Sequence, residues 1–116
     1  MKTTNAFPHQ RLDAYEAAIS LVKDAKGIAD DVPRGYRSFA DQLMRSAGAV
    51  ALLIAEGASR GSKAQKRQRL NEARGETAES AAAVEVLAAL GLANPNDAEA
   101  YLAIAYRVKG MIDGLL

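Results

Sequence analysis

The chain has 116 residues, 15 of them basic and 14 acidic, and its formal net charge is +1. This length suits one domain with one core and leaves no room for separate catalytic and regulatory units. The chain has no cysteine, which excludes disulfides and thiolate metal sites. Because 49% of the residues are hydrophobic, we expect a globular domain over residues 1–116.

Nothing in the sequence predicts export or a membrane span. The first ten residues lack the apolar stretch of a signal peptide. The longest apolar run, Ala49 to Ala55, is far shorter than the roughly 20 residues that cross a bilayer. We therefore expect a cytoplasmic protein.

The first predicted helix covers residues 12–29 and ends in the stretch from Gly27 to Pro33. Its large apolar side chains recur at spacings of three and four, which indicates one buried stripe. The stripe consists of Leu12, Tyr15, Ile19 and Val22.

The second predicted helix covers residues 36–57, with Ser38 as a candidate N-cap and Gly57 as a candidate C-cap. Its expected core face consists of Phe39, Leu43, Ala47, Val50 and Ile54.

The third predicted helix covers residues 62–90, because Ser62 and Gln65 have capping-box spacing and Gly91 follows. A turn around Pro95 precedes the fourth, residues 96–116. The apolar positions of this last helix are Tyr101, Leu102, Ala105, Val108, Ile112 and Leu115. No stretch alternates with period two, so the sequence predicts an all-α, antiparallel up-down four-helix bundle. The four tyrosines are expected to pack at the core edge: Tyr15, Tyr36, Tyr101 and Tyr106.

A second, mostly small and apolar face on the 36–57 helix predicts contact with another subunit. We call it the Leu52 face, and it consists of Met44, Arg45, Gly48, Ala49, Leu52, Ala55 and Glu56. A monomer would expose this face, and soluble monomers seldom expose large apolar patches. The sequence therefore predicts a homo-oligomer.

Arg45 and Glu56 lie three helical turns apart, about 16 Å, so they cannot pair with each other. Expected partners for Arg45 are Glu76, Glu79 or an acid of a neighbouring chain. Glu56 is expected to meet Arg60 or a base of the third helix. The alternative is that both side chains are simply solvated at the rim.

The order of these motifs resembles the 23S rRNA-intervening-sequence protein family of bacterial four-helix bundles. The resemblance rests on Gln42-Leu43, Arg45, Ala47, Ile54-Ala55-Glu56-Gly57, Arg60, Ala73-Arg74-Gly75 and Glu79. This family is similar to the accessory variability protein of diversity-generating retroelements. The resemblance implies a homopentameric ring that contacts nucleic acid or a nucleic-acid-handling protein such as a reverse transcriptase. Two positions depart from the pattern: Leu53 replaces an asparagine, and Glu76 replaces a serine.

Six basic residues gather between residues 60 and 74, where Glu72 is the sole acid. This basic cluster consists of Arg60, Lys63, Lys66, Arg67, Arg69 and Arg74. One hypothesis is a phosphate-binding patch with salt-sensitive, largely sequence-independent affinity for RNA or DNA. The alternatives are a solvated helix end, or ion pairs in an adaptor oligomer that binds a protein.

The sequence does not predict an enzyme, a cofactor or a metal site. His9 is the single histidine and is expected at the surface. Glu72, Glu76 and Glu79 lack the histidine that follows such glutamates in metal-binding bundles. An enzyme that uses carboxylates from neighbouring subunits is the least favoured hypothesis.

Overall fold

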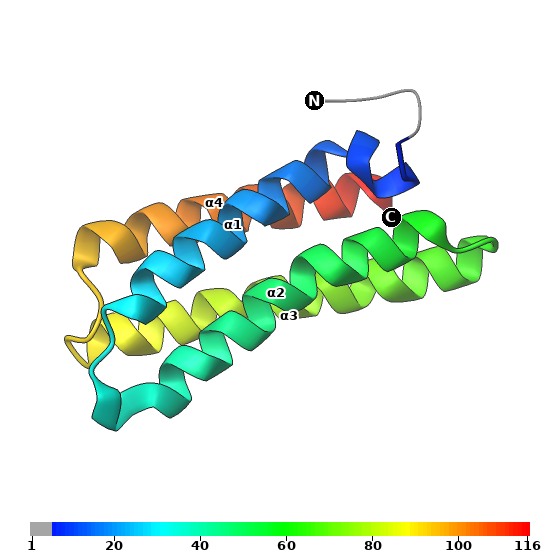
Figure 1. Ribbon diagram of the computed structural model, residues 1–116. Helices are drawn as coiled ribbons and strands as arrows, with labels where there is room; N and C mark the ends of the chain where they lie inside the picture. The colour runs from blue at the N-terminus through cyan, green and yellow to red at the C-terminus, as the bar shows by residue number, and fades with distance from the viewer. Residues whose placement is uncertain (1–5) are drawn as a thin grey trace.

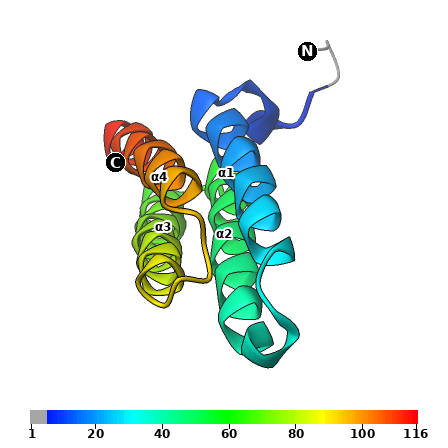
Figure 2. The ribbon, with the colours of Figure 1, turned by 90° about the vertical axis from the view of Figure 1, so that its left-hand side faces the viewer.

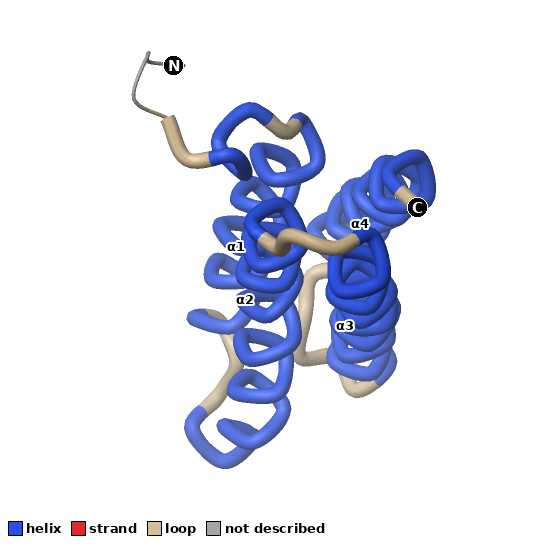
Figure 3. The backbone as a smooth tube through the Cα atoms, turned by 90° about the vertical axis from the view of Figure 1, so that its right-hand side faces the viewer, coloured by secondary structure: helices blue, strands red, loops and turns tan. Residues whose placement is uncertain are grey.

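The computed structural model describes residues 6–116, and every regular element in this part of the chain is helical (Figure 3). The four long helices are α1 (Asp13–Asp30), α2 (Arg37–Ser59), α3 (Lys63–Ala89) and α4 (Pro95–Leu115). Two short 3-10 helices precede α1 and α2, at Pro8–Arg11 (η1) and Arg34–Tyr36 (η2). The expected all-α class is confirmed for the described residues; the first five residues of the predicted 1–116 domain lie outside them.

The helices run alternately up and down along a bundle of 43 × 28 × 22 Å (Figure 1). α1 packs against α2 and α4, and α3 packs against the same two helices. The end view shows the chain passing around the bundle from α1 to α4 (Figure 2). Among the described residues α2 makes no contact with α4, so these two helices lie on opposite corners.

The buried stripe predicted for α1 is wrong. Leu12, Tyr15, Ile19 and Val22 are half-buried at the core margin. The buried side chains of this helix are Ala14, Ala18, Leu21, Ala25, Ile28 and Ala29. Three of the first four are alanines, whose small side chains allow the neighbouring backbones to approach closely, whereas the prediction gave weight to the large side chains alone.

In α2 the predicted core residues Leu43, Ala47, Val50 and Ile54 are fully buried. Phe39 is 40% exposed, so its predicted place in the core is wrong; the small Ala40 is the buried residue of this first turn. Ser38 is not an N-cap, since α2 already begins at Arg37 directly after η2.

Gly57 is not a C-cap, because α2 continues to Ser59. It is buried against α3, where a Cβ atom on Gly57 would lie 3.2 Å from Cγ of Leu70. This glycine therefore allows α2 and α3 to pack closely near their turn.

The ends of α3 and α4 follow local capping chemistry. The Ser62 hydroxyl accepts a hydrogen bond of 3.1 Å from the backbone N–H of Gln65, as its position predicts. Gly91 ends α3 with φ of 73°, a conformation that glycine adopts readily. α4 begins one residue earlier than expected, because the Asn94 side chain accepts a bond of 2.8 Å from the Asn96 N–H.

Four polar side chains lie in the core: Ser46, Thr77, Ser80 and Tyr101. The three small hydroxyls donate to carbonyls of their own helices, as Thr77 does to Ala73 at 2.8 Å. The buried Tyr101 hydroxyl has no hydrogen-bond partner among the described residues. Burial raises the pKa of Tyr101 to about 12, an effect that the nearby Ser80 hydroxyl opposes in part.

Candidate functional site

The Leu52 face lies on the outer side of α2. Leu52 projects from it with 68% of its surface exposed. The four small or flexible apolar residues around it are partly buried: Met44, Gly48, Ala49 and Ala55. The face is therefore a shallow area of small side chains with one large apolar side chain standing above it.

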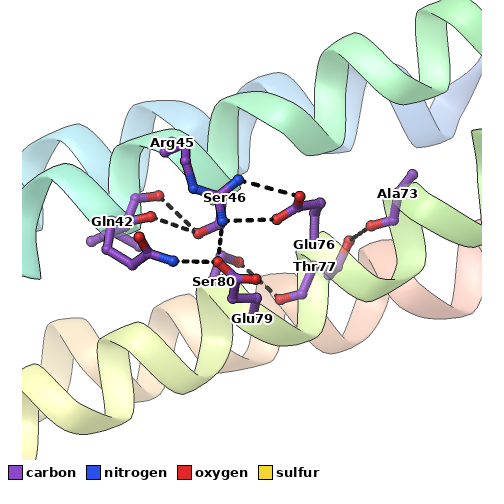
Figure 4. A network of polar contacts seen from close by, with 9 residues as sticks. Gln42, Arg45, Ser46, Ala73, Glu76, Thr77, Glu79 and Ser80 are labelled. Atoms are coloured by element: carbon purple, nitrogen blue, oxygen red, sulfur yellow. Dashed lines mark hydrogen bonds and ion pairs between the residues drawn. The ribbon is translucent and has the colours of Figure 1, made fainter.

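Arg45 reaches across to α3 and pairs with two glutamates (Figure 4). Its Nη1 and Nη2 atoms each donate a hydrogen bond of 3.3 Å to Glu76, and Nη2 also donates to Glu79. Gln42 donates to the same carboxylate of Glu79. The hydrogen bonds with Glu76 raise the pKa of Arg45, although its side chain stays half exposed.

Glu56 is paired at the other end of the Leu52 face. Its carboxylate lies 3.3 Å from Nε of Arg69 on α3 and 3.9 Å from Nη2 of Arg60. Arg69 also pairs with Glu72 at 2.8 Å, and the hydrogen bond to Glu72 is the main reason that the pKa of Arg69 is raised. Both charged residues of the Leu52 face therefore have the partners expected within this chain, and what remains unpartnered on the face is apolar.

Three of the six residues in the basic cluster are paired with acids of the same chain. Arg60 and Arg69 contact Glu56, and Arg74 donates a hydrogen bond of 2.9 Å to Asp113 on α4. Asp113 was not among the predicted partners, because it is 39 residues away from Arg74 and no local spacing links the two.

The other three residues of the basic cluster, Lys63, Lys66 and Arg67, lie in the first turns of α3 and form what we call the basic tip. The side chains of Lys63 and Arg67 make no ion pair or hydrogen bond within residues 6–116. Lys66 donates to the Ala58 carbonyl at 3.5 Å. The turn between α2 and α3 projects beyond the end of α4 (Figure 1), and Lys63 and Arg67 are exposed beside it. Lys66 is partly buried and lines a pocket together with Leu12 and Leu115.

Charge is separated along the length of the bundle. The half with the α2–α3 turn, residues 6–21, 49–75 and 106–116, holds nine basic and five acidic residues. The opposite half, residues 22–48 and 76–105, holds five basic and nine acidic residues. Residues 6–116, whose charges sum to zero, therefore divide into halves with net charges of +4 and −4, and the first half is the one that attracts anions.

A groove between α3 and α4 was not predicted. Its volume is about 260 Å³, and it is lined by Thr77, Ala78, Ala81, Leu102, Ala105, Tyr106 and Lys109. Tyr106 is 78% exposed beside it, while Tyr101 is fully buried, so the expectation that both pack at the core edge is wrong. Ala78 and Ala81 lie three residues apart on one face of α3 and leave it without bulky side chains here, and that spacing of small residues is the signal that indicates such a groove.

Residues 6–116 contain no group of three or more His, Cys, Asp or Glu side chains placed to hold a metal ion. His9 stacks on Phe7 with ring centroids 5.8 Å apart and meets the edge of Tyr15 at 4.6 Å. In the same part of the chain, no helix has the length and apolarity needed to cross a bilayer.

Comparison with known proteins gives a family and a fold. Residues 10–114 match the family described as 23S rRNA-intervening sequence protein. A solved structure of a protein of unknown function from Bacteroides thetaiotaomicron, assigned to the S23 ribosomal protein family, is similar with a TM-score of 0.83. The two sequences are 14% identical, and the match covers 88% of this chain and 96% of that one, so the likeness shows the fold alone. No curated protein matches the chain.

Proposed function

The chain belongs to the 23S rRNA-intervening sequence protein family, and from this premise we propose that it is a non-enzymatic, cytoplasmic helical bundle that assembles as a homopentamer and binds nucleic acid through its basic tip. The observation that carries the proposal is the separation of the basic cluster into paired and unpaired members. Lys63 and Arg67 have no acidic partner within the described residues, although acids neutralise three neighbours.

The basic tip favours contact with phosphates over contact with bases. Basic residues in the first turn of a helix oppose the helix dipole, so local stability does not account for Lys63 and Lys66. No aromatic residue lies between Arg60 and Arg74, so the basic cluster itself has no interleaved side chain on which bases stack. The expected binding is sequence-independent and weakens with salt.

Assembly strengthens this binding. A ring of parallel copies places all basic tips on one side, and all acidic halves on the other. Each tip contributes few phosphate contacts, but linked copies bind together with a high effective concentration. Light scattering should give five times the 12.3 kDa of the chain.

The test is a triple variant of the basic tip, Lys63→Glu, Lys66→Glu and Arg67→Glu. Its matched control reverses three bases of the acidic half, Lys23→Glu, Lys26→Glu and Arg34→Glu, and so has the same net charge. We expect the tip variant to lose RNA and DNA binding in low salt and the control to lose much less. The slope of log K against log salt should fall by about one unit for each phosphate contact removed. Equal binding by both variants would remove the basic tip from the function.

The second candidate is an adaptor oligomer that binds a protein. Arg60, Arg69 and Arg74 favour it, because they form ion pairs inside the chain and so serve structure. In that case the purified protein carries no nucleic acid, as its ultraviolet absorbance ratio would show. A protein partner would remain bound after the tip is reversed.

A further inference from the structure

Two apolar surfaces of the bundle have complementary shapes. The Leu52 face is shallow, and Leu52 stands out from it with 68% of its surface exposed. The α3–α4 groove is recessed and is lined mainly by Ala78, Ala81, Leu102 and the ring of Tyr106. α2 and α4 lie on opposite corners of the bundle, so a single chain cannot bring the two surfaces together.

We propose that the Leu52 face of one copy docks into the α3–α4 groove of the next copy. This inference rests on the assembly proposed above and names the two surfaces that form it. Burying Leu52 in the groove removes two exposed apolar surfaces from water with one contact.

The contact is heterologous, because it joins two different surfaces. Each copy then presents one Leu52 face and one groove, and copies add head to tail until the rotation closes a ring.

Charges beside the two surfaces also match when neighbouring copies are parallel. Glu85 lies one turn beyond Ala81 on α3, about 6 Å toward the acidic half, and has no ion pair within the described residues. Arg45 lies about 10 Å from Leu52 in the same direction, with half of its side chain exposed. Docking Leu52 near Ala81 therefore brings a half-exposed guanidinium toward an unpaired carboxylate.

Two single variants test the contact, and each places a charge on one of the two apolar surfaces. Leu52→Glu should give particles of one-chain mass, and Tyr106→Glu should do the same, both with unchanged helical circular dichroism. The matched control is Ala103→Glu, which places the same charge at an exposed site of α4 outside the groove lining, and which should keep full size. If a glutamate variant loses its helical signal, Leu52→Ser and Tyr106→Ser replace it, with the same expected sizes.

Mixing the two variants gives the sharpest result. The Leu52→Glu copy keeps an intact groove, and the Tyr106→Glu copy keeps an intact Leu52 face, so an equimolar mixture can form one native contact and no second. We expect a population of two-chain particles in the mixture and none in either variant alone.

Three outcomes would overturn the inference. Full-size particles from Tyr106→Glu together with one-chain particles from Leu52→Glu would show that the Leu52 face meets another surface, with assembly itself intact. A mixture that stays at one-chain mass would exclude the head-to-tail pairing. Wild-type protein of one-chain mass would end the assembly proposal as well.

Discussion

α3 has two neighbours, and its contacts with them differ in kind. Toward α2 the contact is closed: Gly57 allows a close approach to Leu70, and Arg45 and Glu56 form ion pairs across it. Toward α4, Arg74 and Lys109 hold Asp113 at one end, and a groove remains open beside Tyr106. One helix can thus complete its packing on one side and offer a surface for docking on the other.

The largest expected effect comes from removing a side chain in the closed contact. Leu70→Ala should lower the free energy of unfolding by about 3 kcal/mol, because it leaves a cavity against Gly57, and Leu70 is 7% exposed. Leu102→Ala in the groove should cost a much smaller amount, since Leu102 is only partly buried. Urea unfolding of the two variants measures this difference. Equal losses would show that the groove is packed as firmly as the α2–α3 contact.

The buried Tyr101 hydroxyl on α4 should make the folded state less stable at alkaline pH. Burial raises the pKa of Tyr101 to about 12 from an ordinary value of 10.0. The folded state therefore holds this proton more tightly than the unfolded state. The resulting stability, about 3 kcal/mol for a pKa difference of about two, is present below pH 10 and is lost as the pH rises toward 12.

Tyr101→Phe should remove this alkaline dependence while changing stability little at pH 7, since the hydroxyl has no hydrogen-bond partner within the described residues. Tyr36→Phe, at an exposed position, is the control. Urea unfolding at pH 7 and at pH 11 gives both comparisons. The same pH dependence in all three proteins would contradict the argument.

Two glycines, Gly57 in the α2–α3 contact and Gly75 on the exposed surface of α3, should respond in opposite directions. Gly57→Val should destabilise the bundle by about 1–2 kcal/mol by overpacking against Leu70. Gly75→Ala should stabilise it by about 0.5–1 kcal/mol, because a Cβ at Gly75 meets no atom within 4 Å. Thermal unfolding of the two variants should give shifts of opposite sign, and a stabilised Gly57→Val would refute the close contact.

The smallest effect is expected from replacing Asp113, whose ion pair with Arg74 joins α3 to α4. Hydrogen bonds from Lys109 and then from Arg74 lower the pKa of Asp113. Its contribution is therefore present above its unfolded pKa and is lost as the pH falls through the lower folded pKa. Asp113→Asn should reduce the melting temperature slightly at pH 7 and not at pH 2. The exposed Glu99→Gln serves as control, and an equal decrease at both pH values would show that charge is not the cause.

Local chemistry made much of the fold predictable. Ser62, Gly91 and Pro95 mark helix ends through hydrogen bonds or backbone geometry that involve near neighbours in the chain. The apolar spacing of α2 likewise identified Leu43, Ala47, Val50 and Ile54 as core residues. On α1 the same reasoning failed, because alanine is apolar but small, and only the neighbouring helices decide that Ala18 and Ala25 face the centre.

The candidate surfaces also combine features set within one helix and features set by packing between helices. Spacing within single helices was enough to predict the four helices, the second apolar face of α2 and the basic residues at the start of α3. The pairing of Arg74 with Asp113 could be known only from the tertiary structure, because the two residues are 39 positions apart in the chain. The tertiary structure also decided that Tyr101 is buried and Tyr106 exposed, since the packing of α4 against two neighbours at once selects which of its sides faces inward.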